Sequence, residues 1–524
     1  MKSLYIKSVV TSLVLLLTFA ACTDFDELNT NPDGITSANP ETLAAGLILG
    51  ITRNDINTEK SFMALHMISK YILWSEFPQS EQYNDFGRTS FVNMTRLIDA
   101  DKMVEFAEST EGLDEGIVNS YRALRHFMRA YTLFDLTMRV GDIPYSDALK
   151  GEAEANLRPG YDTQKEVFLG ILDELDEANR LFTSGAPFDG DMIYGGDPVK
   201  WQKMVNSFAL KVLINLYKKT GDGDLRVKER FNEIANNRSV MEGNEDNFSL
   251  KFENAAGQMY PFHELGNQFV IYPLVSDILI DKLKELEDYR LFYYTEPSPV
   301  QVENGLDISD YEAYKGVAPS MPYSEMQGIH ASKDYSDINK RYKEVPKGEP
   351  VFLLSYAQVQ FILAEAAVRG WISGDAETYY REGIRASMYL VADNTPGNPN
   401  SEEPPFHHNR VMDKDYIDNY YANTPTVQLA VSTEEQLEQI ITQKFLCTFL
   451  QSPLEPYFEN RRTGYPHFPI NPETNENVPA DKLPVRWLYP QDELNYNSEN
   501  VNEAIDRQYN GNDNVNELMW ILKD

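Results

Sequence analysis

Long segments with apolar residues at helical spacing are the feature that most restricts the fold of this chain. In 117–140 the apolar positions recur every three or four residues: Val118, Tyr121, Leu124, Met128, Tyr131 and Phe134. This spacing predicts one amphipathic helix, and 163–181 and 433–450 predict two more. Another begins at Asp197-Pro198, where an N-cap residue precedes a proline suited to the first turn. We therefore expect an all-α (α-rich) fold with little β-structure.

The segment 352–388 matches the size pattern of a tetratricopeptide helix pair. Small residues at Ala364, Ala376 and Gly383 would let two helices approach closely, while Tyr380 fills the remaining gap. No strict 34-residue repeat runs along the chain, so we expect the tetratricopeptide-like pairs to be irregular.

Four loop-rich regions separate the predicted helices: 78–91, 260–272, 293–347 and 394–426. They are rich in Tyr, Pro, Asn and Gly. Loops of this length in a compact domain are usually either functional or disordered, and their aromatic content favours ordered, functional loops. The prediction is a helical scaffold that carries a loop-rich ligand-binding face.

The N-terminus has the pattern of an exported lipoprotein. Lys2 and Lys7 precede an apolar run at 9–19, and Ala20-Ala21 stand before Cys22. A charged start, a short apolar run and small residues at a cleavage site are typical of a secretory signal. We expect a signal peptide at 1–21, lipidation of Cys22, an acidic and polar tether over 22–40, and a single helical domain over 41–524.

Charge and cysteine content narrow the possible partners. The net charge is −34, with 47 basic and 81 acidic residues. Loss of Lys2 and Lys7 with the signal peptide makes it 45 − 81 = −36. A field of this sign repels nucleic acid, and it leaves the N-terminal lipid as the expected contact with the membrane. If Cys22 carries lipid, Cys447 has no partner within the chain, and its apolar surroundings predict a small buried side chain.

Sequence patterns for catalysis and metal binding are weak. There is no His-Glu-x-x-His, no Gly-x-Ser-x-Gly and no glycine-rich phosphate loop. The segment 29–34 resembles the start of a calcium loop, but position 40, where the bidentate Glu is needed, is Pro. We therefore expect no cofactor, no metal and no catalytic residues.

Sugar binding requires flat apolar rings for stacking, with amides, carboxylates or arginine to hydrogen-bond the hydroxyl groups. Two regions offer such side chains, and the candidates for ligand contact are Trp74, Tyr83, Asn84, Phe86, Arg88, Phe262, His263, Tyr314 and Tyr323. For Trp74, packing in the core at a helix end is the competing interpretation.

Several blocks together resemble the SusD/RagB family of nutrient-binding outer-membrane lipoproteins of Bacteroidota. They are GDIPYSDAL (141–149), YDTQKEVFLGILDELDEA (161–178), DMIYGGDPVKWQKMVNSFALKVLINL (191–216), SYAQVQFILAEAAVRG (355–370), ITQKFL…ENRRTGYP (441–466) and PVRWLYPQDELNYNSENV (484–501). They occur in one order along nearly the whole chain. The C-terminus, NELMWILKD, departs from the paired-Trp ending common in relatives.

The resemblance implies a lipoprotein on the cell surface, anchored in the outer membrane, that forms a lid on a SusC-like TonB-dependent transporter. Such a lid captures oligosaccharides and delivers them for import without catalysis. Three alternatives stay open: a peptide or glycopeptide binder on the same scaffold, an all-helical glycoside hydrolase, and a protein-interaction scaffold.

The arginine-rich positions have a structural interpretation. Arg461, Arg462 and Arg486 lie in the family-like blocks, yet in so acidic a chain their guanidinium groups are expected to pair with carboxylates and carbonyl groups. The cluster Arg122, Arg125 and Arg129 on one helix face is expected to pair with neighbouring acidic segments.

Overall fold

The structure is a computed structural model that describes residues 39–52, 59–151, 156–265, 272–398 and 406–524. The chain divides into two units, Met1–Asn39 and Pro40–Asp524. The second unit holds all the elements described below. The predicted signal peptide, Cys22 and nearly all of the predicted tether lie outside the described residues.

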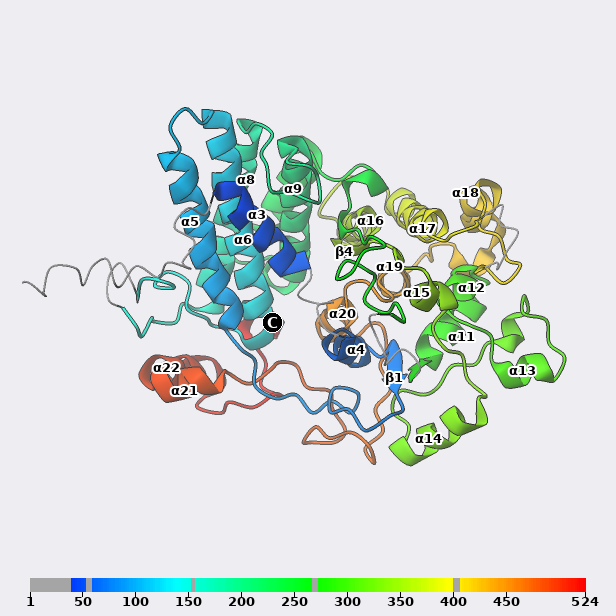
Figure 1. Ribbon diagram of the computed structural model, residues 1–524. Coiled ribbons are helices and arrows are strands. Elements are labelled where there is room, and N and C mark those ends of the chain that lie inside the picture. Colours follow the sequence, from blue (N-terminus) through cyan, green and yellow to red (C-terminus); the bar gives the residue numbers. More distant parts are fainter. Residues whose placement is uncertain (1–38, 53–58, 152–155, 266–271, 399–405) are drawn as a thin grey trace, which may run out of the picture. The chain divides into compact units, whose positions relative to one another are not determined.

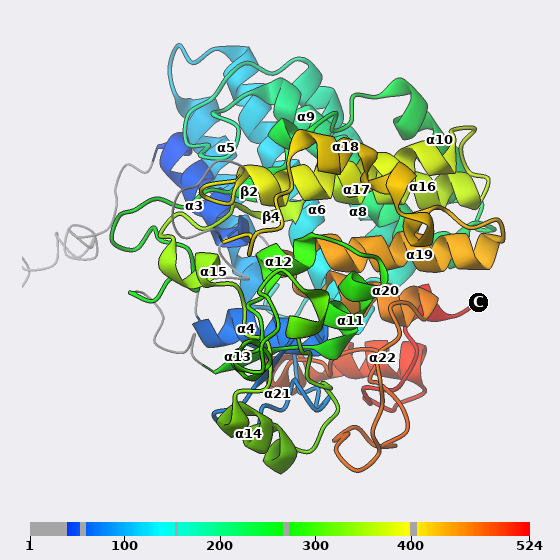
Figure 2. The ribbon, with the colours of Figure 1, turned by 90° about the vertical axis from the view of Figure 1, so that its right-hand side faces the viewer.

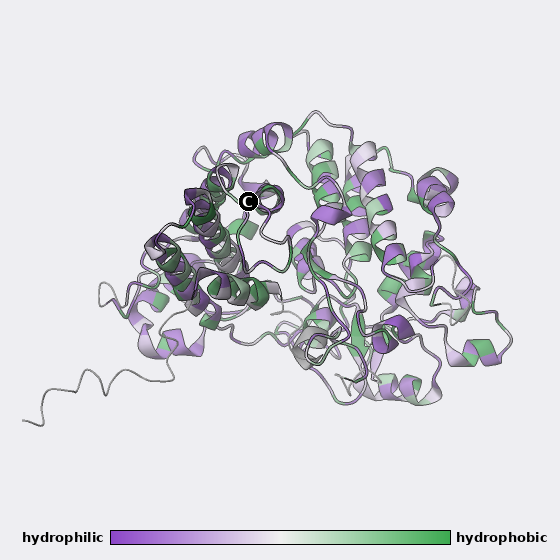
Figure 3. Ribbon diagram, turned by 45° about the horizontal axis from the view of Figure 1, so that its top comes forward, coloured by the Kyte–Doolittle hydropathy of each residue, from purple (hydrophilic) through white to green (hydrophobic). Residues whose placement is uncertain are grey.

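Helices dominate the unit, as predicted. In its N-terminal half, long helices lie side by side and pack on one another in chain order (Figure 1). They are α3 (Pro40–Thr52), α5 (Arg96–Ser109), α6 (Glu115–Val140), α8 (Gln164–Thr183), α9 (Pro198–Asn215) and α10 (Val227–Asn237). Many helices carry hydrophobic and hydrophilic residues on different sides (Figure 3). Helix α8 buries one such apolar face, whereas α9 is buried along most of its length.

The predicted helix starts are confirmed by their caps. Thr163 forms a capping box with Glu166 at the start of α8. Asp197 caps α9 and precedes Pro198 in its first turn. In each case a side-chain oxygen accepts a hydrogen bond from a backbone N–H that the helix leaves without a partner.

The predicted tetratricopeptide-like pair is present as α16 (Tyr356–Val368) and α17 (Ala376–Asp393). Both helices pack on α19 (Thr433–Cys447) (Figure 2). A Cβ atom added at Gly383 would lie 2.6 Å from Cε1 of Phe361, so only glycine permits this approach. Tyr380 is 1% exposed and fills the space beside the contact, as expected.

Buried ion pairs hold helices of the C-terminal half of the unit together. The Arg462 guanidinium in α20 (Glu455–Thr463) donates to Glu365 of α16 at 2.6 and 2.8 Å, and it also pairs with Glu459. Lys444 of α19 pairs with Glu459 at 2.6 Å. The network shows that Arg462 braces the scaffold.

The other arginines expected to be structural are also paired. Arg461 donates to the carbonyl group of Val485 at 3.0 Å, and Arg486 pairs with Asp513 at 2.5 Å. The cluster on α6 pairs with acidic residues of neighbouring segments, namely Arg122 with Glu108 and Glu115, Arg125 with Asp101, and Arg129 with Glu174.

The described β-structure consists of two short antiparallel pairs. Strand β1 (Ile72–Trp74) pairs with β3 (Pro273–Val275), with Trp74 opposite Pro273. Strand β2 (Phe248–Leu250) pairs with β4 (Val351–Leu354). These strands connect segments that are distant in the sequence, and β1 and β3 form the base of the site described below.

The regions predicted as long loops contain short helices that lack a clear apolar period. In 293–347 and 394–426 these are α13 (Pro299–Glu303), α14 (Tyr323–Ser332), α15 (Lys340–Glu344) and α18 (Lys414–Asn423). The remaining α-helices are α4 (Glu59–Ile68), α11 (Asp277–Glu285), α12 (Arg290–Tyr294), α21 (Gln491–Tyr496) and α22 (Ser498–Tyr509). Among the described helices, none has both the length and the apolar character that a membrane span requires.

Candidate ligand-binding site

Four aromatic rings line up on the loop-rich side of the unit, and we call them the aromatic ladder: Trp74, Tyr272, His330 and Tyr335. Their successive ring centroids are 5.2, 6.3 and 5.5 Å apart. Trp74 is 1% exposed, whereas the other three rings are half-buried. The three half-buried rings are partly accessible to solvent, and aromatic rings have apolar faces on which a flat ligand can stack.

The ladder rests on the β1–β3 pair and on α14. Trp74 ends β1, Tyr272 directly precedes β3, His330 lies in α14 and Tyr335 follows that helix. A small apolar cluster joins these elements and is made of Leu73, Leu274, Val317 and Met326. Because this cluster is almost fully buried, the short strands and the helix are held as one platform.

Polar groups lie next to the ladder. The Tyr323 hydroxyl donates to the carbonyl group of Ser75 at 3.1 Å and accepts from Nε2 of Gln327 at 3.0 Å. Burial and the nearby Glu76 carboxylate raise the pKa of Tyr323, while the bond from Gln327 opposes them. Phe77 is 38% exposed. The surface therefore combines rings with an exposed carboxylate and hydroxyl and amide groups.

A second feature, which we call the amide pocket, lies beside the ladder. It encloses about 200 Å³ of space, partly open to solvent, and is lined by Lys70, Gln82, Tyr83, Asn84, Pro319, Ser320, Pro469, Asn471, Thr474 and Asn475. Gln82 connects the two features, because its Oε1 accepts from the backbone N–H of Trp74 at 3.0 Å and its amide lies against Met326 under the ladder.

The structure brings four of the nine predicted contact residues to this region. Trp74 and Tyr323 belong to the ladder and its edge, and Tyr83 and Asn84 line the amide pocket. The Tyr83 hydroxyl donates to the carbonyl group of Met321, and Asn84 is in the left-handed conformation, with φ at 65°. The burial of Trp74 agrees with the core interpretation of that residue.

Phe86 and Arg88 lie elsewhere, against the C-terminal segment. Phe86 is 6% exposed and stacks on Trp487 with centroids 4.6 Å apart. Arg88 donates to Asp513 at 2.9 Å and to the carbonyl group of Tyr489 at 2.7 Å. Both side chains fasten the loop to the scaffold in this structure.

Phe262, His263 and Tyr314 are buried, and Phe262 and Tyr314 share a hydrophobic cluster with Trp74. Phe262 and Tyr314 are fully buried, and His263 is 3% exposed. The Tyr314 hydroxyl donates to the carbonyl group of Ile308 at 2.8 Å. In this conformation these three side chains belong to the core, and a direct contact with a ligand stays a prediction.

Sequence reasoning did not select Tyr272, His330, Tyr335 or Lys70. Tyr272 and Tyr335 stand in the loop regions marked as aromatic-rich, so a signal was present but did not single them out. Lys70 lies two residues after α4 and two before β1, and the pocket around it is completed by Asn471 and Asn475, about 400 positions away. Such a contact leaves no local pattern in the sequence.

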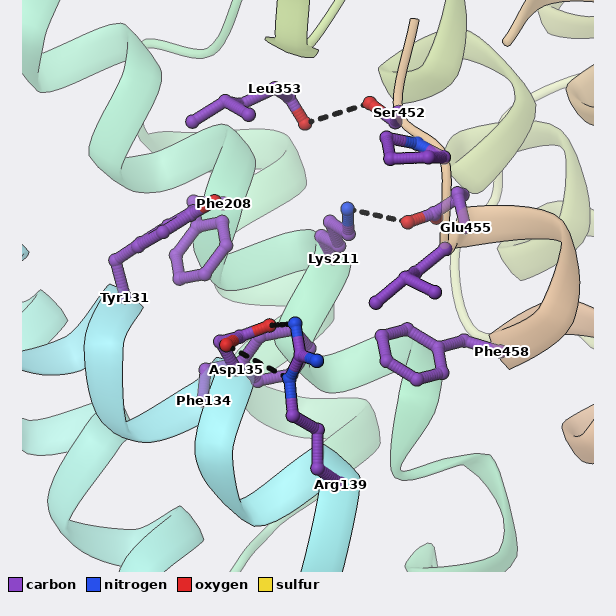
Figure 4. Close-up of a pocket in the computed structure, with 12 residues that line it drawn as sticks. Tyr131, Phe134, Asp135, Arg139, Phe208, Lys211, Leu353, Ser452, Glu455 and Phe458 are labelled. Atoms are coloured by element: carbon purple, nitrogen blue, oxygen red, sulfur yellow. Dashed lines mark hydrogen bonds and ion pairs between the residues drawn. The ribbon is translucent and has the colours of Figure 1, made fainter. Parts of the chain in front are cut away.

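A larger hollow lies between α6, α9 and α20, and Figure 4 shows its lining. It encloses about 530 Å³, partly open to solvent, with Phe134, Phe208 and Phe458 among its walls. Its charged groups pair with each other, Asp135 with Arg139 at 3.0 Å and Lys211 with Glu455 at 2.6 Å.

One of the two carboxylates of this hollow, Glu455, is poorly suited to acid catalysis. Burial alone would raise the pKa of Glu455, but Lys211 and Lys444 outweigh burial and lower it to about 2. A glycosidase needs one carboxyl group that stays protonated near neutral pH. Elsewhere in the described residues, no group of three or more His, Cys, Asp or Glu side chains is arranged to hold a metal ion.

Comparison with known proteins shows which family shares this architecture. Residues 32–490 match the model of a SusD-like family described as starch-binding and associating with the outer membrane. A solved SusD homologue of Bacteroides fragilis is 45% identical and superimposes with a TM-score of 0.87 over 93% of this chain and all of the other. A second SusD homologue of that species is 34% identical, with a TM-score of 0.80 over the same shares.

A curated relative is SusD-like protein P2 of Formosa agariphila, which is 30% identical over 191 residues. That match covers 32% of this chain and 37% of the relative, so it spans little more than a third of the relative's length.

Proposed function

Because this chain belongs to the SusD-like family, which is described as starch-binding and associating with the outer membrane, we propose that it captures oligosaccharides on its loop face. It then delivers them to a SusC-like TonB-dependent transporter and leaves their bonds intact. The lipid on Cys22 anchors the chain in the outer membrane with the binding unit at the cell surface.

The aromatic ladder is the observation that carries this proposal. Pyranose rings have apolar faces that stack on aromatic rings, and their hydroxyl groups need donors and acceptors at the edge of the stack. Tyr272, His330 and Tyr335 provide the faces, and Tyr323 and Glu76 provide polar groups beside them. The buried cluster beneath the rings holds the platform together, and a preorganised surface loses little conformational entropy on binding.

The Figure 4 hollow is a weaker candidate for the same role. Its cations and carboxylates already form short ion pairs, so a ligand would have to break them or leave them unused. The half-buried rings of the ladder present no such competition. A peptide is the second candidate ligand, because the amide pocket offers groups that hydrogen-bond a peptide backbone as readily as hydroxyl groups.

Titration calorimetry with the chain from Thr23 onwards, against panels of oligosaccharides and peptides, tests the proposal. We expect micromolar to millimolar binding of an oligosaccharide, and chromatography of the mixture should show no cleavage products. Tyr272→Ala and Tyr335→Ala should each weaken binding about tenfold, or about 1.4 kcal/mol.

Tyr496→Ala is the matched control. Tyr496 lies in α21 and is 73% exposed, so its loss should leave affinity unchanged. Binding of peptides alone would favour the second candidate, and accumulation of reducing ends with the purified protein would contradict the proposal.

A further inference from the structure

Lys70 is an unusual cation in so acidic a chain. Its Nζ donates to the carbonyl group of Gln82 and to Oδ1 of Asn84, both at 2.7 Å. The residue is 2% exposed. Among the described residues it forms no ion pair, whereas Lys211 and Lys444, buried elsewhere, pair with glutamates. Lys70 thus lacks the carboxylate that usually accompanies a buried ammonium group.

The hydrogen bonds of Lys70 leave one donor unused. An ammonium group has three N–H donors, and its two acceptors are neutral. A buried charge without a counter-charge is costly, and burial lowers the pKa of Lys70 to about 7. At neutral pH Lys70 is therefore protonated in only part of the molecules, and a bound anion would favour the protonated form.

Amide groups around Lys70 have donors left over as well. A side-chain amide has two N–H hydrogens. Asn84 uses one toward Oδ1 of Asn475 at 3.1 Å, and Asn471 uses one toward the carbonyl group of Ser320 at 3.1 Å. One hydrogen of each amide stays available in a pocket with one cation and no paired carboxylate.

From this arrangement we propose that the amide pocket binds a carboxylate group of the ligand, and that Lys70 selects ligands carrying that charge. The inference rests on the proposed function and gives it a substrate class, acidic ligands. The carboxylate could belong to a sugar acid or to a peptide C-terminus. In either case it completes the ion pair that Lys70 lacks.

Two titratable groups near Lys70, His66 and Tyr83, change charge outside the range from pH 6 to 8.5. Burial lowers the pKa of His66 in α4 to about 3 and raises that of Tyr83 to about 12. On the loops around the pocket, burial and then the nearby Asp85 carboxylate raise the pKa of Glu476. A change in affinity over this range therefore reports on Lys70.

The test uses two matched pairs of ligands in calorimetry with the chain from Thr23 onwards. One pair is a galacturonate trisaccharide and the galactose trisaccharide of the same linkage. The other is N-acetylated tetra-alanine with a free or an amidated C-terminus. At pH 6 we expect the acidic member of one pair to bind at least tenfold more tightly, and the responding pair identifies the source of the carboxylate.

Two further measurements follow the charge on Lys70. The preference should shrink as pH rises and Lys70 loses its proton, by up to about thirtyfold between pH 6 and 8.5 for a pKa of about 7. Lys70→Met should abolish the preference while retaining affinity for the neutral ligand. Because φ of Lys70 is 59°, the unbranched methionine meets the same backbone constraint. Lys228→Met, at an exposed position of α10, should change nothing.

Equal binding of acidic and neutral ligands would overturn the inference, and so would a preference that persists in Lys70→Met. If that variant does not fold, the pH series on the unaltered chain decides. Tight binding of the neutral trisaccharide with no charge preference would leave the proposed function intact, whereas failure of all four ligands would count against both.

Discussion

Replacing Arg462 with methionine is the sharpest test of what holds the unit together. The Arg462 side chain is 2% exposed and makes two hydrogen bonds to Glu365, at 2.6 and 2.8 Å, besides its pair with Glu459. Arg462→Met keeps most of the apolar volume and removes the charge. Two buried carboxylates then lose a shared partner.

The expected loss of stability follows from what those carboxylates retain. Removing one partner of a buried pair costs about 3–5 kcal/mol when the other charge is left uncompensated. Here Glu365 keeps Arg369 at 2.8 Å and Glu459 keeps Lys444 at 2.6 Å. We therefore expect a value near the lower limit, about 3 kcal/mol.

The pH dependence provides an independent check. Burial alone would raise the pKa of Glu365, but Arg462, together with Arg369 and Lys444, outweighs burial and lowers it to about 2, from 4.5 in the unfolded chain. A lowered pKa means that the unfolded chain binds the proton more readily. The stabilisation from Glu365 is therefore complete above pH 4.5 and lost as pH falls toward 2. In Arg462→Met this acid-dependent loss should be smaller.

Urea unfolding followed by circular dichroism measures both effects, provided that unfolding remains a single transition. Lys282→Met is the control. Its pair with Glu285, at 2.6 Å, is partly exposed on both sides, so it should contribute less than about 0.5 kcal/mol. A loss below about 1 kcal/mol for Arg462→Met, or an unchanged acid profile, would refute the reasoning.

Two other predictions concern packing. Gly383→Ala places a Cβ atom 2.6 Å from the Phe361 ring and should destabilise the unit by about 1–3 kcal/mol in urea unfolding. Gly328→Ala in α14 meets no atom within 4 Å and should be neutral or stabilising by up to about 1 kcal/mol; equal effects would contradict the packing argument. Burial raises the pKa of the Cys447 thiol to about 12, so an aromatic disulfide reagent should label the chain from Thr23 onwards only after urea is added. Rapid labelling of the native chain would show that Cys447 is accessible.

The parts of the fold that the sequence predicted are those encoded over many consecutive residues. Helices α6 and α8 show their apolar period over five or more turns, and their caps are local. The contact at Gly383 was also predictable, because small residues at helical spacing indicate a close approach. Strands β1 and β3 were not predicted, because three residues are too few for a period and their pairing spans about 200 positions.

The site was only partly predictable for a related reason. A single aromatic residue in a loop has the same local sequence pattern whether it packs inward, as Phe86 does, or stays partly exposed on the proposed ligand surface, as Tyr335 does. The difference depends on which distant segment covers it. Trp487 covers Phe86, and nothing in the local sequence around either residue indicates that contact.

Different residues of the unit are expected to determine its stability and its ligand affinity. The buried ion pairs lie where α16, α19 and α20 meet, whereas the ladder and the amide pocket rest on two short strands, α14 and loops. Changes at Arg462 should therefore lower the free energy of unfolding while the remaining folded molecules keep their ligand affinity. Changes at Tyr335 or Lys70 should alter affinity with less effect on unfolding. A variant of Arg462 that lost affinity in proportion to its stability would show instead that the scaffold and the loop face act as a single cooperative unit.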